Sequence, residues 1–447
     1  MPQKGLFARK SQSHSIRFGV NKPVGSRLLH HMKILFLTEN FPPETNAAAT
    51  RVYERALYWV RDGHSVTILT SAPNFPEGKV FEGYSNRWRQ VDNVDGIRVV
   101  RVKTLIAANK GIILRTLDFI SFMITAFVAG LFEKRPDVIA ATSPQFFAAV
   151  GGWMLAACRT RPFVFELGDL WPASIAAVGA IKHSLPLRLV EKLELFLYRK
   201  SAAVAALTYA FKRNLVSRGI DPNKIWVVRN GVDAGRYGLR TRHAQLEAEH
   251  GLKGKFVIGY IGTHGLAHAL DQVIESAFLL KNEKNIRFLF AGAGAARASL
   301  IEQAGQLGLS NVVFLPMQPK ERIPDIWSLC DLALVHLKDE PTFTEVIPSK
   351  VFEAMGMGLP ILIAAPKGEA TDIVTAERAG IVVSPPNPNS LADAICMLRD
   401  DVATRKTYAK NALAAAPQYS REKQADEMIE VFASVISGVS HTAKEIS

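Results

Sequence analysis

The chain has 447 residues, 48% of them hydrophobic, and a formal net charge of +13 at pH 7. This length exceeds one ordinary domain and this hydrophobic content provides substantial cores, so we expect two domains and exclude a mainly disordered chain. The three cysteines, Cys158, Cys330 and Cys396, lack metal-ligand spacing and lie in apolar stretches. They predict reduced, buried thiols rather than a disulfide framework.

Residues 1–31 are polar, basic and without hydrophobic periodicity. Six Lys and Arg precede Met32 and no acid comes before Glu39, so the chain from Met32 onward carries about +7. We predict a disordered arm or a targeting peptide here. Because the first expected strand follows Met32 directly, Met32 is an alternative start to Met1, and no secretory apolar region precedes it.

Short apolar runs alternate with helical patterns after Met32, which predicts an α/β chain with mostly parallel sheets. The first series of expected strands comprises Lys33–Thr38, Val66–Thr70, Ile97–Val102, Asp137–Ala141, Phe163–Leu167, Ala203–Leu207 and Ile225–Val228. The second comprises Phe256–Ile261, Ile286–Phe290, Val312–Leu315, Leu332–Val335, Ile361–Ala364 and Ile381–Val383. A polar, glycine-bearing stretch separates the series, so we predict a first domain over 32–235, a linker over 236–254, a second domain over 255–415 and a terminal helix and tail over 416–447.

One stretch of the first domain, FISFMITAFVAGLF at residues 119–132, is apolar apart from Ser121 and Thr125. It is shorter than the roughly 20 residues that span a bilayer, and Arg115 and Asp118 interrupt its upstream extension. The pattern favours a core helix, with a helix lying in a membrane surface as the alternative.

The stretch NFPEGKVFEGYSNRWR, residues 74–89, mixes aromatic and basic side chains. Arg87, Trp88 and Arg89 would suit a lipid-pyrophosphate acceptor near a membrane. Aromatic side chains favour the membrane–water interface, and basic side chains pair with the phosphates of the lipid. An ordinary exposed loop is the alternative. No nucleic-acid-binding module accompanies these residues, so we expect no nucleic-acid partner.

A carboxylate-rich turn, ELGDLWP at residues 166–172, follows an expected strand at the edge where open α/β sheets bind ligands. Asp169 could orient a sugar hydroxyl or stabilise positive charge at an anomeric carbon, or it could simply cap the turn. The small-residue stretch FPPETNAAATR, residues 41–51, follows the first strand in the same way.

The first strand of the second series ends in GTHGLAHALDQ, a glycine-bracketed loop that opens a helix. Gly262 and Gly265 can let backbone N–H groups approach a diphosphate, assisted by the helix dipole. Gly262, Thr263 and His264 are therefore candidate nucleotide-sugar-binding residues. The loop AGAGAAR, ending at Arg297, is similar to a dinucleotide fingerprint, but the next strand ends without an acidic residue. We therefore disfavour an NAD-dependent dehydrogenase and expect Arg297, or a protonated His264, to help neutralise phosphate.

The stretch EVIPSKVFEAMGMGLPI, residues 345–361, combines a helix start with a following buried strand. Pro348 suits the first turn of a helix that begins near Ile347. The free N–H groups of this turn, with Ser349 and Lys350, offer a seat for a phosphate or pyrophosphate.

Two glutamates flank that helix start. Glu345 stays in the loop, whereas Glu353 lies inside the helix, roughly 8 Å along the axis, where it can reach a ribose beside the phosphate. Two solvated glutamates on a surface helix are the alternative, but the surrounding Pro, Ser-Lys and Gly-Leu-Pro favour a nucleotide-sugar site.

The stretch resembles the sequence signature of the family-4 retaining glycosyltransferases, whose GT-B fold is an α/β architecture of two facing Rossmann-like domains with a cleft between them. The resemblance implies that Glu345 lies by the donor sugar and that Glu353 binds the nucleotide ribose. The DLWP element, residues 169–172, resembles one in the subgroup that builds bacterial polysaccharides, especially transferases of the L-fucosamine type. Asp169 and Glu345 would then frame the sugar as the catalytic pair.

The chain departs from the family in three places. Asn46, Ala47 and Ala48 stand where many relatives have a glycine pair. Gly168 stands where other members often have a histidine, and Thr263 and His268 occupy the apparent positions of an Arg and a Lys that much of the family carries. Neutralisation of the diphosphate must then come largely from Lys350.

The resemblance covers about residues 32–435 and implies a transferase that moves a sugar from a nucleotide donor, UDP by family inference, to a lipid-linked or oligosaccharide acceptor. An N-acetylated 6-deoxy sugar would fit the subgroup. It also implies a terminal helix that crosses back to the first domain, no cofactor and no required metal. We expect a cytoplasmic protein with a peripheral contact at the inner face of the plasma membrane. A nucleotide-sugar epimerase or hydrolase, and a non-catalytic nucleotide-sugar-binding partner, remain alternatives.

Overall fold

The computed structural model describes residues 31–75, 77–106, 112–143, 146–170 and 185–438. The chain divides after His31, and every element below belongs to the unit Met32–Ser447. The extension predicted over residues 1–31 lies outside the described residues except for His31, as do Trp171 and Pro172 of the DLWP element.

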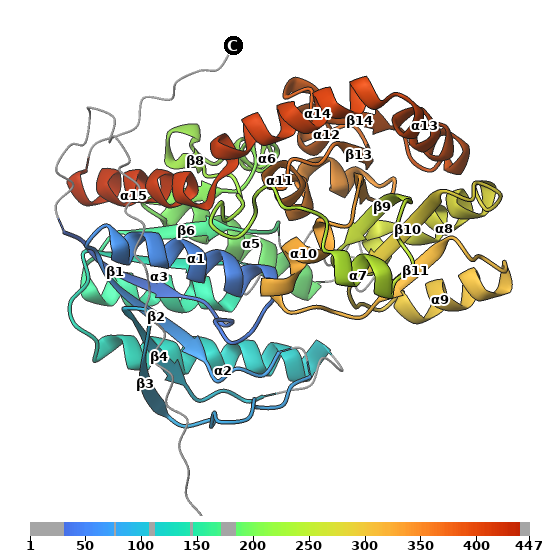
Figure 1. The fold of residues 1–447 in the computed structure, drawn as a ribbon. Helices are drawn as coiled ribbons and strands as arrows, with labels where there is room; N and C mark the ends of the chain where they lie inside the picture. The colour runs from blue at the N-terminus through green and yellow to red at the C-terminus, as the bar shows by residue number, and fades with distance from the viewer. Residues whose placement is uncertain (1–30, 76, 107–111, 144–145, 171–184, 439–447) are drawn as a thin grey trace, which may run out of the picture. The chain divides into compact units, whose positions relative to one another are not determined.

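The first half of this unit is built on an eight-stranded sheet (Figure 1). Its strands are β1 (Lys33–Leu37), β2 (Ser65–Ser71), β3 (Arg89–Val94), β4 (Ile97–Val102), β5 (Val138–Thr142), β6 (Phe163–Leu167), β7 (Ala203–Ala206) and β8 (Ile225–Val227). Their order is β3-β4-β2-β1-β5-β6-β7-β8, and all neighbours are parallel except the antiparallel pair β3 and β4. The order reverses between β1 and β5, as in doubly wound folds, so the carboxyl ends of these strands form a ligand-binding edge.

Helices cover both faces of this sheet. The helices in this half are α1 (Ala47–Arg61), α2 (Ile112–Leu131), α3 (Phe146–Arg159), α5 (Leu185–Lys200) and α6 (Tyr209–Ser217). One apolar core joins the sheet to α2, α3 and α5, and a second core joins its other face to α1. Burial on both faces explains why these strands are continuous apolar runs.

The second half is built on a six-stranded, fully parallel sheet with the order β11-β10-β9-β12-β13-β14. Its strands are β9 (Phe256–Ile261), β10 (Ile286–Ala291), β11 (Val312–Leu315), β12 (Leu332–His336), β13 (Ile361–Ala364) and β14 (Gly380–Val383). Its helices are α7 (Ala244–Glu249), α8 (Leu270–Leu279), α9 (Arg297–Gln306), α10 (Ile323–Trp327), α11 (Ser349–Gly356), α12 (Glu369–Ala376), α13 (Pro388–Asp400) and α14 (Val402–Ala415). This is the Rossmann strand order, with its reversal between β9 and β12.

The last helix, α15 (Arg421–Ser437), packs on the first sheet's half of the chain. The indole Nε1 of Trp59 in α1 donates a hydrogen bond to the Ala425 carbonyl oxygen at 3.0 Å. The ring of Phe432 meets the same indole edge-on, with centroids 5.4 Å apart. The chain thus returns to its first sheet after completing the second.

The sequence analysis missed strand β3: the loop that it described ends at Arg89, and it assigned residues 90–94 to no element. The strand's residues, RQVDNV, alternate between half-buried and exposed positions because it lies at the sheet edge. The turn to β4 uses Asp95 and Gly96, both with positive φ, which is the Asp-Gly signal of a two-residue hairpin.

The prediction of three buried cysteines was also wrong. Only Cys330 is buried, whereas Cys158 is exposed and Cys396 is half-buried. Cys158 lies near the end of α3, on the side that does not contact the core, so its apolar sequence neighbours did not reveal its exposure.

Candidate functional site

A cavity of about 350 Å³ lies at the carboxyl end of β9, between residues of both halves. Helix α1 contributes Thr50 and Glu54 to its lining, and the second half contributes Gly262, Lys350 and Glu353. The cavity therefore occupies the position where a doubly wound sheet binds ligands. Predicted site residues Thr263 and Ser349 also line it.

Two glycines allow the backbone to come close to this cavity. Gly262 has φ +139°, a conformation that L side chains rarely adopt, and a Cβ there would lie 3.4 Å from Lys350 Nζ. A Cβ at Gly292 would approach the Gly262 carbonyl oxygen to 1.9 Å. Glycine at both positions lets the loops after β9 and β10 meet beneath the cavity.

Lys350 is a buried cation at the start of α11. Only 6% of the residue is exposed, and its Nζ lies over the Tyr260 ring, 3.7 Å from the centroid. No carboxylate of the described residues forms an ion pair with it. Burial lowers the pKa of Lys350 to about 7, although the nearby Glu353 carboxylate opposes the shift. An anion in the cavity would supply the partner that this ammonium group lacks.

Glu353 lies one turn further along α11. Its Oε2 accepts a hydrogen bond from Trp327 Nε1 at 3.1 Å, and its Oε1 accepts one from Ser349 Oγ at 3.4 Å. Burial raises the pKa of Glu353, while Trp327, Lys350 and Ser349 oppose that rise. Each carboxylate oxygen retains acceptor capacity, so Glu353 can accept hydroxyl groups of a ligand.

The α1 side of the cavity carries further charges that sequence reasoning missed. Glu54 accepts bonds from Arg236 Nη1 at 2.7 Å and from Arg421 Nε at 3.0 Å. Lys320 follows β11 and lines the same cavity without an ion-pair partner among the described residues. Burial lowers its pKa to about 8. A lysine shortly after the carboxyl end of a parallel strand was the available signal for Lys320.

Two predicted ligands, His264 and Arg297, do not line the cavity. His264 is fully buried, and neither ring nitrogen has a hydrogen-bond partner among the described residues. Burial, Arg297 and Lys350 lower the pKa of His264 to about 4, so its ring is neutral at pH 7. Protonation of His264 would need a neighbouring anion, so its role as a phosphate partner stays a prediction. Arg297 is the first residue of α9, beside His264.

Glu345 lies at the end of a 3₁₀ helix, Pro341–Glu345, and faces the first half of the chain. Its carbonyl oxygen accepts a bond from Thr208 Oγ1 at 3.1 Å, and its Oε1 accepts one from Asn214 Nδ2 at 3.4 Å. Glu345 does not line the cavity that holds Glu353. The predicted start of α11 near Ile347 was slightly early, since Pro348 is extended and caps a helix that begins at Ser349.

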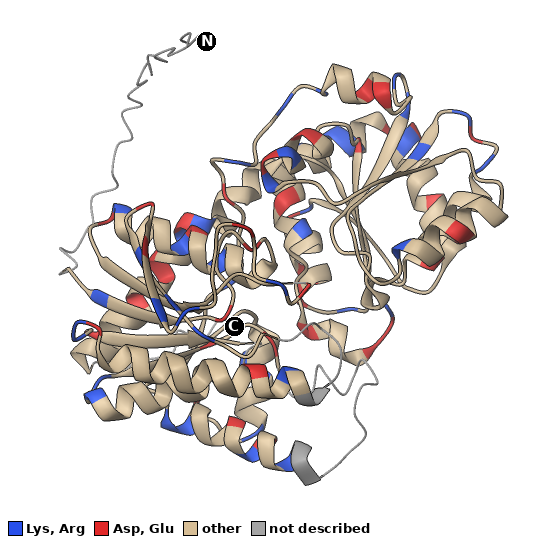
Figure 2. Cartoon of the chain, turned by 90° about the horizontal axis from the view of Figure 1, so that it is seen from below, with Lys and Arg blue, Asp and Glu red and all other residues tan. Residues whose placement is uncertain are grey.

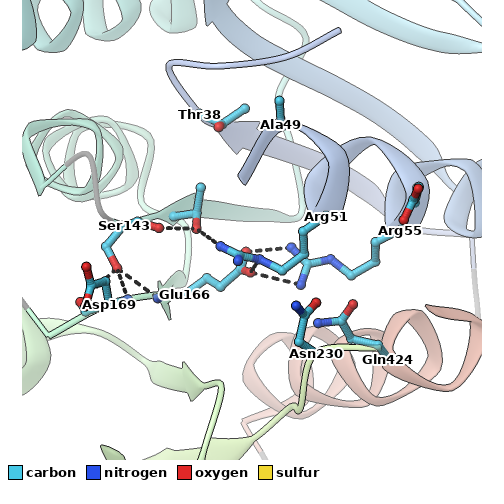
Figure 3. Close-up of polar contacts among 12 residues, drawn as sticks. Thr38, Ala49, Arg51, Arg55, Ser143, Glu166, Asp169, Asn230 and Gln424 are labelled. Atoms are coloured by element: carbon cyan, nitrogen blue, oxygen red, sulfur yellow. Dashed lines mark hydrogen bonds and ion pairs between the residues drawn. The ribbon is translucent and has the colours of Figure 1, made fainter. Parts of the chain in front are cut away.

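Asp169 lies in a turn held by Ser143 (Figure 3). Ser143 Oγ accepts the backbone N–H of Gly168 at 2.8 Å and that of Asp169 at 3.2 Å, and it donates to the Asp169 carbonyl oxygen at 3.3 Å. A Cβ at position 168 would lie 2.7 Å from Arg51 Nη2. Arg51 thus occupies the space that a side chain at position 168 would need, and Asp169 lies outside the cavity lining.

Beneath that turn, Glu166 forms a buried cluster with two arginines of α1 (Figure 3). Its Oε1 accepts from Arg51 Nε at 2.9 Å and from Arg55 Nη1 at 3.1 Å. Its Oε2 accepts from Arg55 Nη2, and Arg51 also donates to Thr142 Oγ1 at 3.1 Å. The cluster fixes α1 against β6.

The predicted acceptor-side residues lie at the start of β3 and do not line the cavity. Trp88 is 73% exposed and Arg87 is exposed beside it. Arg89 Nη2 pairs with Glu133 Oε1 at 2.6 Å. The described residues contain no group of three or more His, Cys, Asp or Glu side chains arranged to hold a metal ion.

Comparison with known protein families shows which family carries this arrangement. The model "Glycosyltransferase Family 4" matches residues 48–236, and "Glycosyl transferases group 1" matches residues 243–415. Together they cover well over half of the chain, one on each sheet. The chain is a family-4 glycosyltransferase.

Curated relatives of this glycosyltransferase include two bacterial proteins, one of them named for colanic acid biosynthesis. The putative colanic acid biosynthesis glycosyl transferase WcaI of Escherichia coli is 25% identical over 75% of this chain and 83% of its own length. The probable glycosyltransferase WbjE of Pseudomonas aeruginosa is 26% identical over 53% of this chain and 60% of its own length.

Solved structures show that the glycosyltransferase has the GT-B fold. Anabaena Alr3699/HepE in complex with UDP and glucose matches 90% of this chain and all of its own, with a TM-score of 0.68 and 20% identity. Sucrose-phosphate synthase from Thermosynechococcus elongatus matches 91% of this chain and all of its own, with a TM-score of 0.71 and 15% identity. The expectation of two Rossmann-like halves is confirmed.

Proposed function

We propose that this glycosyltransferase moves a sugar from a UDP-linked donor to a lipid-linked or oligosaccharide acceptor of a cell-surface polysaccharide, with retention of anomeric configuration. The single observation that carries the donor assignment is the 350 Å³ cavity with the unpaired, buried Lys350 beside Gly262. HepE, a structural neighbour, was solved with UDP and with UDP-glucose, which supports a uridine nucleotide. The resemblance to L-fucosamine-type transferases favours an N-acetylated 6-deoxy sugar.

Three features of the cavity suit a nucleoside diphosphate. The N-terminal turn of α11 begins at Ser349 and presents free N–H groups, and Lys350 adds positive charge. Lys320 adds a second cation at the α1 side. Glu353, already held by Trp327 and Ser349, is oriented to accept the ribose hydroxyls.

The sugar would then extend toward the edge of the first sheet. Glu345, bonded to Asn214, and Asp169, in the turn held by Ser143, are the proposed catalytic residues. Their carboxylates would orient sugar hydroxyls and stabilise positive charge at the anomeric carbon. Both lie outside the cavity lining, so this role requires the sugar to lie beyond the nucleotide.

The proposed reaction breaks the bond between the anomeric carbon and the phosphate oxygen and forms a bond to the acceptor oxygen on the same face. The acceptor hydroxyl's proton passes to the departing phosphate oxygen, and UDP leaves. Lys350 and the α11 N–H groups stabilise the charge that develops on this phosphate. No covalent nucleophile is assigned.

The test is binding and turnover with a panel of UDP-sugars, including N-acetylated 6-deoxy sugars, with a membrane-lipid extract as acceptor. We expect UDP release that depends on the acceptor and is lost in Glu353→Ala. Release without acceptor would indicate a hydrolase, conversion of the sugar without UDP release an epimerase, and binding without turnover a non-catalytic partner. Absence of UDP-sugar binding would overturn the donor assignment.

The proposed site of action is the cytoplasmic side of the plasma membrane, where nucleotide sugars and lipid-linked acceptors meet. Figure 2 shows Lys and Arg interspersed with Asp and Glu over the described chain, so net charge alone does not define a docking face. A membrane contact must therefore be sought in a local surface.

A further inference from the structure

Helix α2 presents an apolar face to solvent. Among the described residues it is the one helix long and apolar enough to cross a membrane, yet only 28% of the stretch Leu114–Leu131 is buried. The side chains of this α2 face are Leu114 (59% exposed), Leu117, Ile124 (53%), Val128, Leu131 and Phe132 (78%). Their spacing places the first five on one side of the helix, and Phe132 follows directly after its last residue.

The opposite side of α2 belongs to the core of the first half. Phe122, Ala126 and Ala129 are buried there with residues of the sheet and of α3. The helix therefore cannot leave the domain to span a bilayer without exposing that core. A helix that is apolar on both its core side and its outer side requires a second apolar environment for the outer side.

Charges near this face are positive. Lys134 and Arg135, just past the end of the helix, are exposed. Arg115 is exposed too, but its guanidinium lies over the Phe119 ring, on another side of the helix. Glu133 is buried and pairs with Arg89 at 2.6 Å and Arg98 at 2.9 Å. Asp118 is buried too, so residues 112–135 expose no acidic side chain where the structure describes them.

We propose that the α2 face lies on an anionic lipid bilayer, with the helix parallel to the membrane plane. The apolar side chains would enter the boundary between headgroups and acyl chains, and the flanking cations would meet lipid phosphates. This inference deepens the proposed function by bringing the enzyme to a lipid-linked acceptor, and it assigns the membrane contact to α2 rather than to Trp88.

Co-sedimentation with vesicles tests this assignment. We expect the full chain to bind phosphatidylglycerol-containing vesicles more tightly than phosphatidylcholine vesicles. The triple variant Leu117→Gln, Ile124→Gln, Val128→Gln should bind at least about tenfold more weakly, because three side chains lose their apolar burial.

A matched control replaces three exposed apolar residues of the second half with Gln, one each on α8, α9 and α13: Leu279→Gln, Ile301→Gln and Met397→Gln. It should bind vesicles like the wild type. The charge variant Lys134→Gln, Arg135→Gln should weaken binding to anionic vesicles by about fivefold per charge at low salt. This second variant removes no apolar contact, so it tests the proposal even if the triple variant unfolds.

Wild-type protein that stays in the supernatant with anionic vesicles would overturn the proposal, as would a folded triple variant that binds normally. Light scattering tests whether a second copy of the chain covers this face instead. If the wild type does not bind vesicles and is a dimer, and the triple variant is a monomer, the α2 face is a contact between copies. Vesicle binding is measured without substrate, so a negative transferase assay does not contradict the membrane proposal. UDP binding is measured without vesicles or detergent, so a protein that fails to bind vesicles can still confirm the donor site.

Discussion

Two buried charged groups near the carboxyl edges of the two sheets differ in how they are compensated. Glu166 on β6 has both carboxylate oxygens occupied by the guanidinium groups of Arg51 and Arg55. Burial alone would raise the pKa of Glu166, but these arginines hold it below its usual value. Lys350 on α11 is as well buried but has no such partner, and its pKa falls to about 7.

The difference separates structure from ligand binding. A buried carboxylate whose partners are all internal contributes to the fold and has little capacity left for a substrate. A buried ammonium group without a carboxylate partner costs stability in the empty protein, and that cost is relieved only when an anion enters the cavity. Removing the Glu166 charge should therefore lower the free energy of unfolding, whereas removing the Lys350 charge should raise it and weaken anion binding.

Glu166→Gln should produce the largest effect, a loss of about 3–5 kcal/mol in the free energy of unfolding. The substitution leaves Arg51 and Arg55 as buried cations without a carboxylate. Urea denaturation measures it, with Glu422→Gln as control. Glu422 pairs with Arg61 at 2.6 Å, but both side chains are more than half exposed. The control should change stability by no more than about 0.5 kcal/mol, and equal effects in both variants would contradict the comparison.

Lys350→Met should weaken UDP binding about 100-fold, or roughly 2–3 kcal/mol, without lowering stability. The fold should become more stable by about 1–3 kcal/mol, since methionine fills a similar volume without a buried charge. Calorimetric titration with UDP and urea denaturation measure the two quantities. Lys338→Met, at an exposed lysine paired with Glu340, is the control and should change neither. A Lys350→Met protein that binds UDP normally would remove Lys350 from the proposed site.

The pH dependence of UDP binding should report the same lysine. Below about pH 7, Lys350 is already protonated in the free protein. Above about pH 7 it is mostly neutral in the free protein, and UDP binding must add a proton to it, because a bound phosphate raises the pKa of Lys350. UDP affinity should therefore fall by up to about tenfold per pH unit above pH 7, where the UDP phosphate is fully ionised. Calorimetry in two buffers should detect proton uptake at pH 8. Lys350→Arg should abolish most of this slope between pH 7 and 8, and an unchanged slope would assign the titration to another group.

Much of the fold follows from local sequence. The strands Phe163–Leu167 and Phe256–Ile261 were predicted to the residue, because parallel strands buried on both faces are continuous apolar runs with polar ends. The terminal helix predicted within residues 416–447 is α15, Arg421–Ser437. Strand β3 was missed because an edge strand needs no apolar run, and only its Asp-Gly turn indicated it.

The site was harder to predict because it depends on contacts between distant segments. Gly262 and Lys350 are far apart in sequence, and their proximity follows from the order of β9, β12 and β13 in one sheet. The burial of His264 depends on the loop after β10, which packs against its backbone. The contact of Glu345 with Asn214 joins a 3₁₀ helix of the second half to α6 of the first. No local sequence pattern encodes contacts between distant segments. Residue type and spacing therefore indicated candidate site residues but not which of them line the same cavity.

Lys320 provides the smallest expected effect and the finest test of the comparison. It lines the cavity without an ion pair, like Lys350, but it is less deeply buried and its pKa falls only to about 8. Lys320→Met should weaken UDP binding by about fivefold, since a partly solvated cation gains less from an anion than a buried one. Titration with uridine separates the effects: a phosphate contact predicts no change in uridine affinity, and an equal loss for uridine and UDP would place Lys320 near the nucleoside instead.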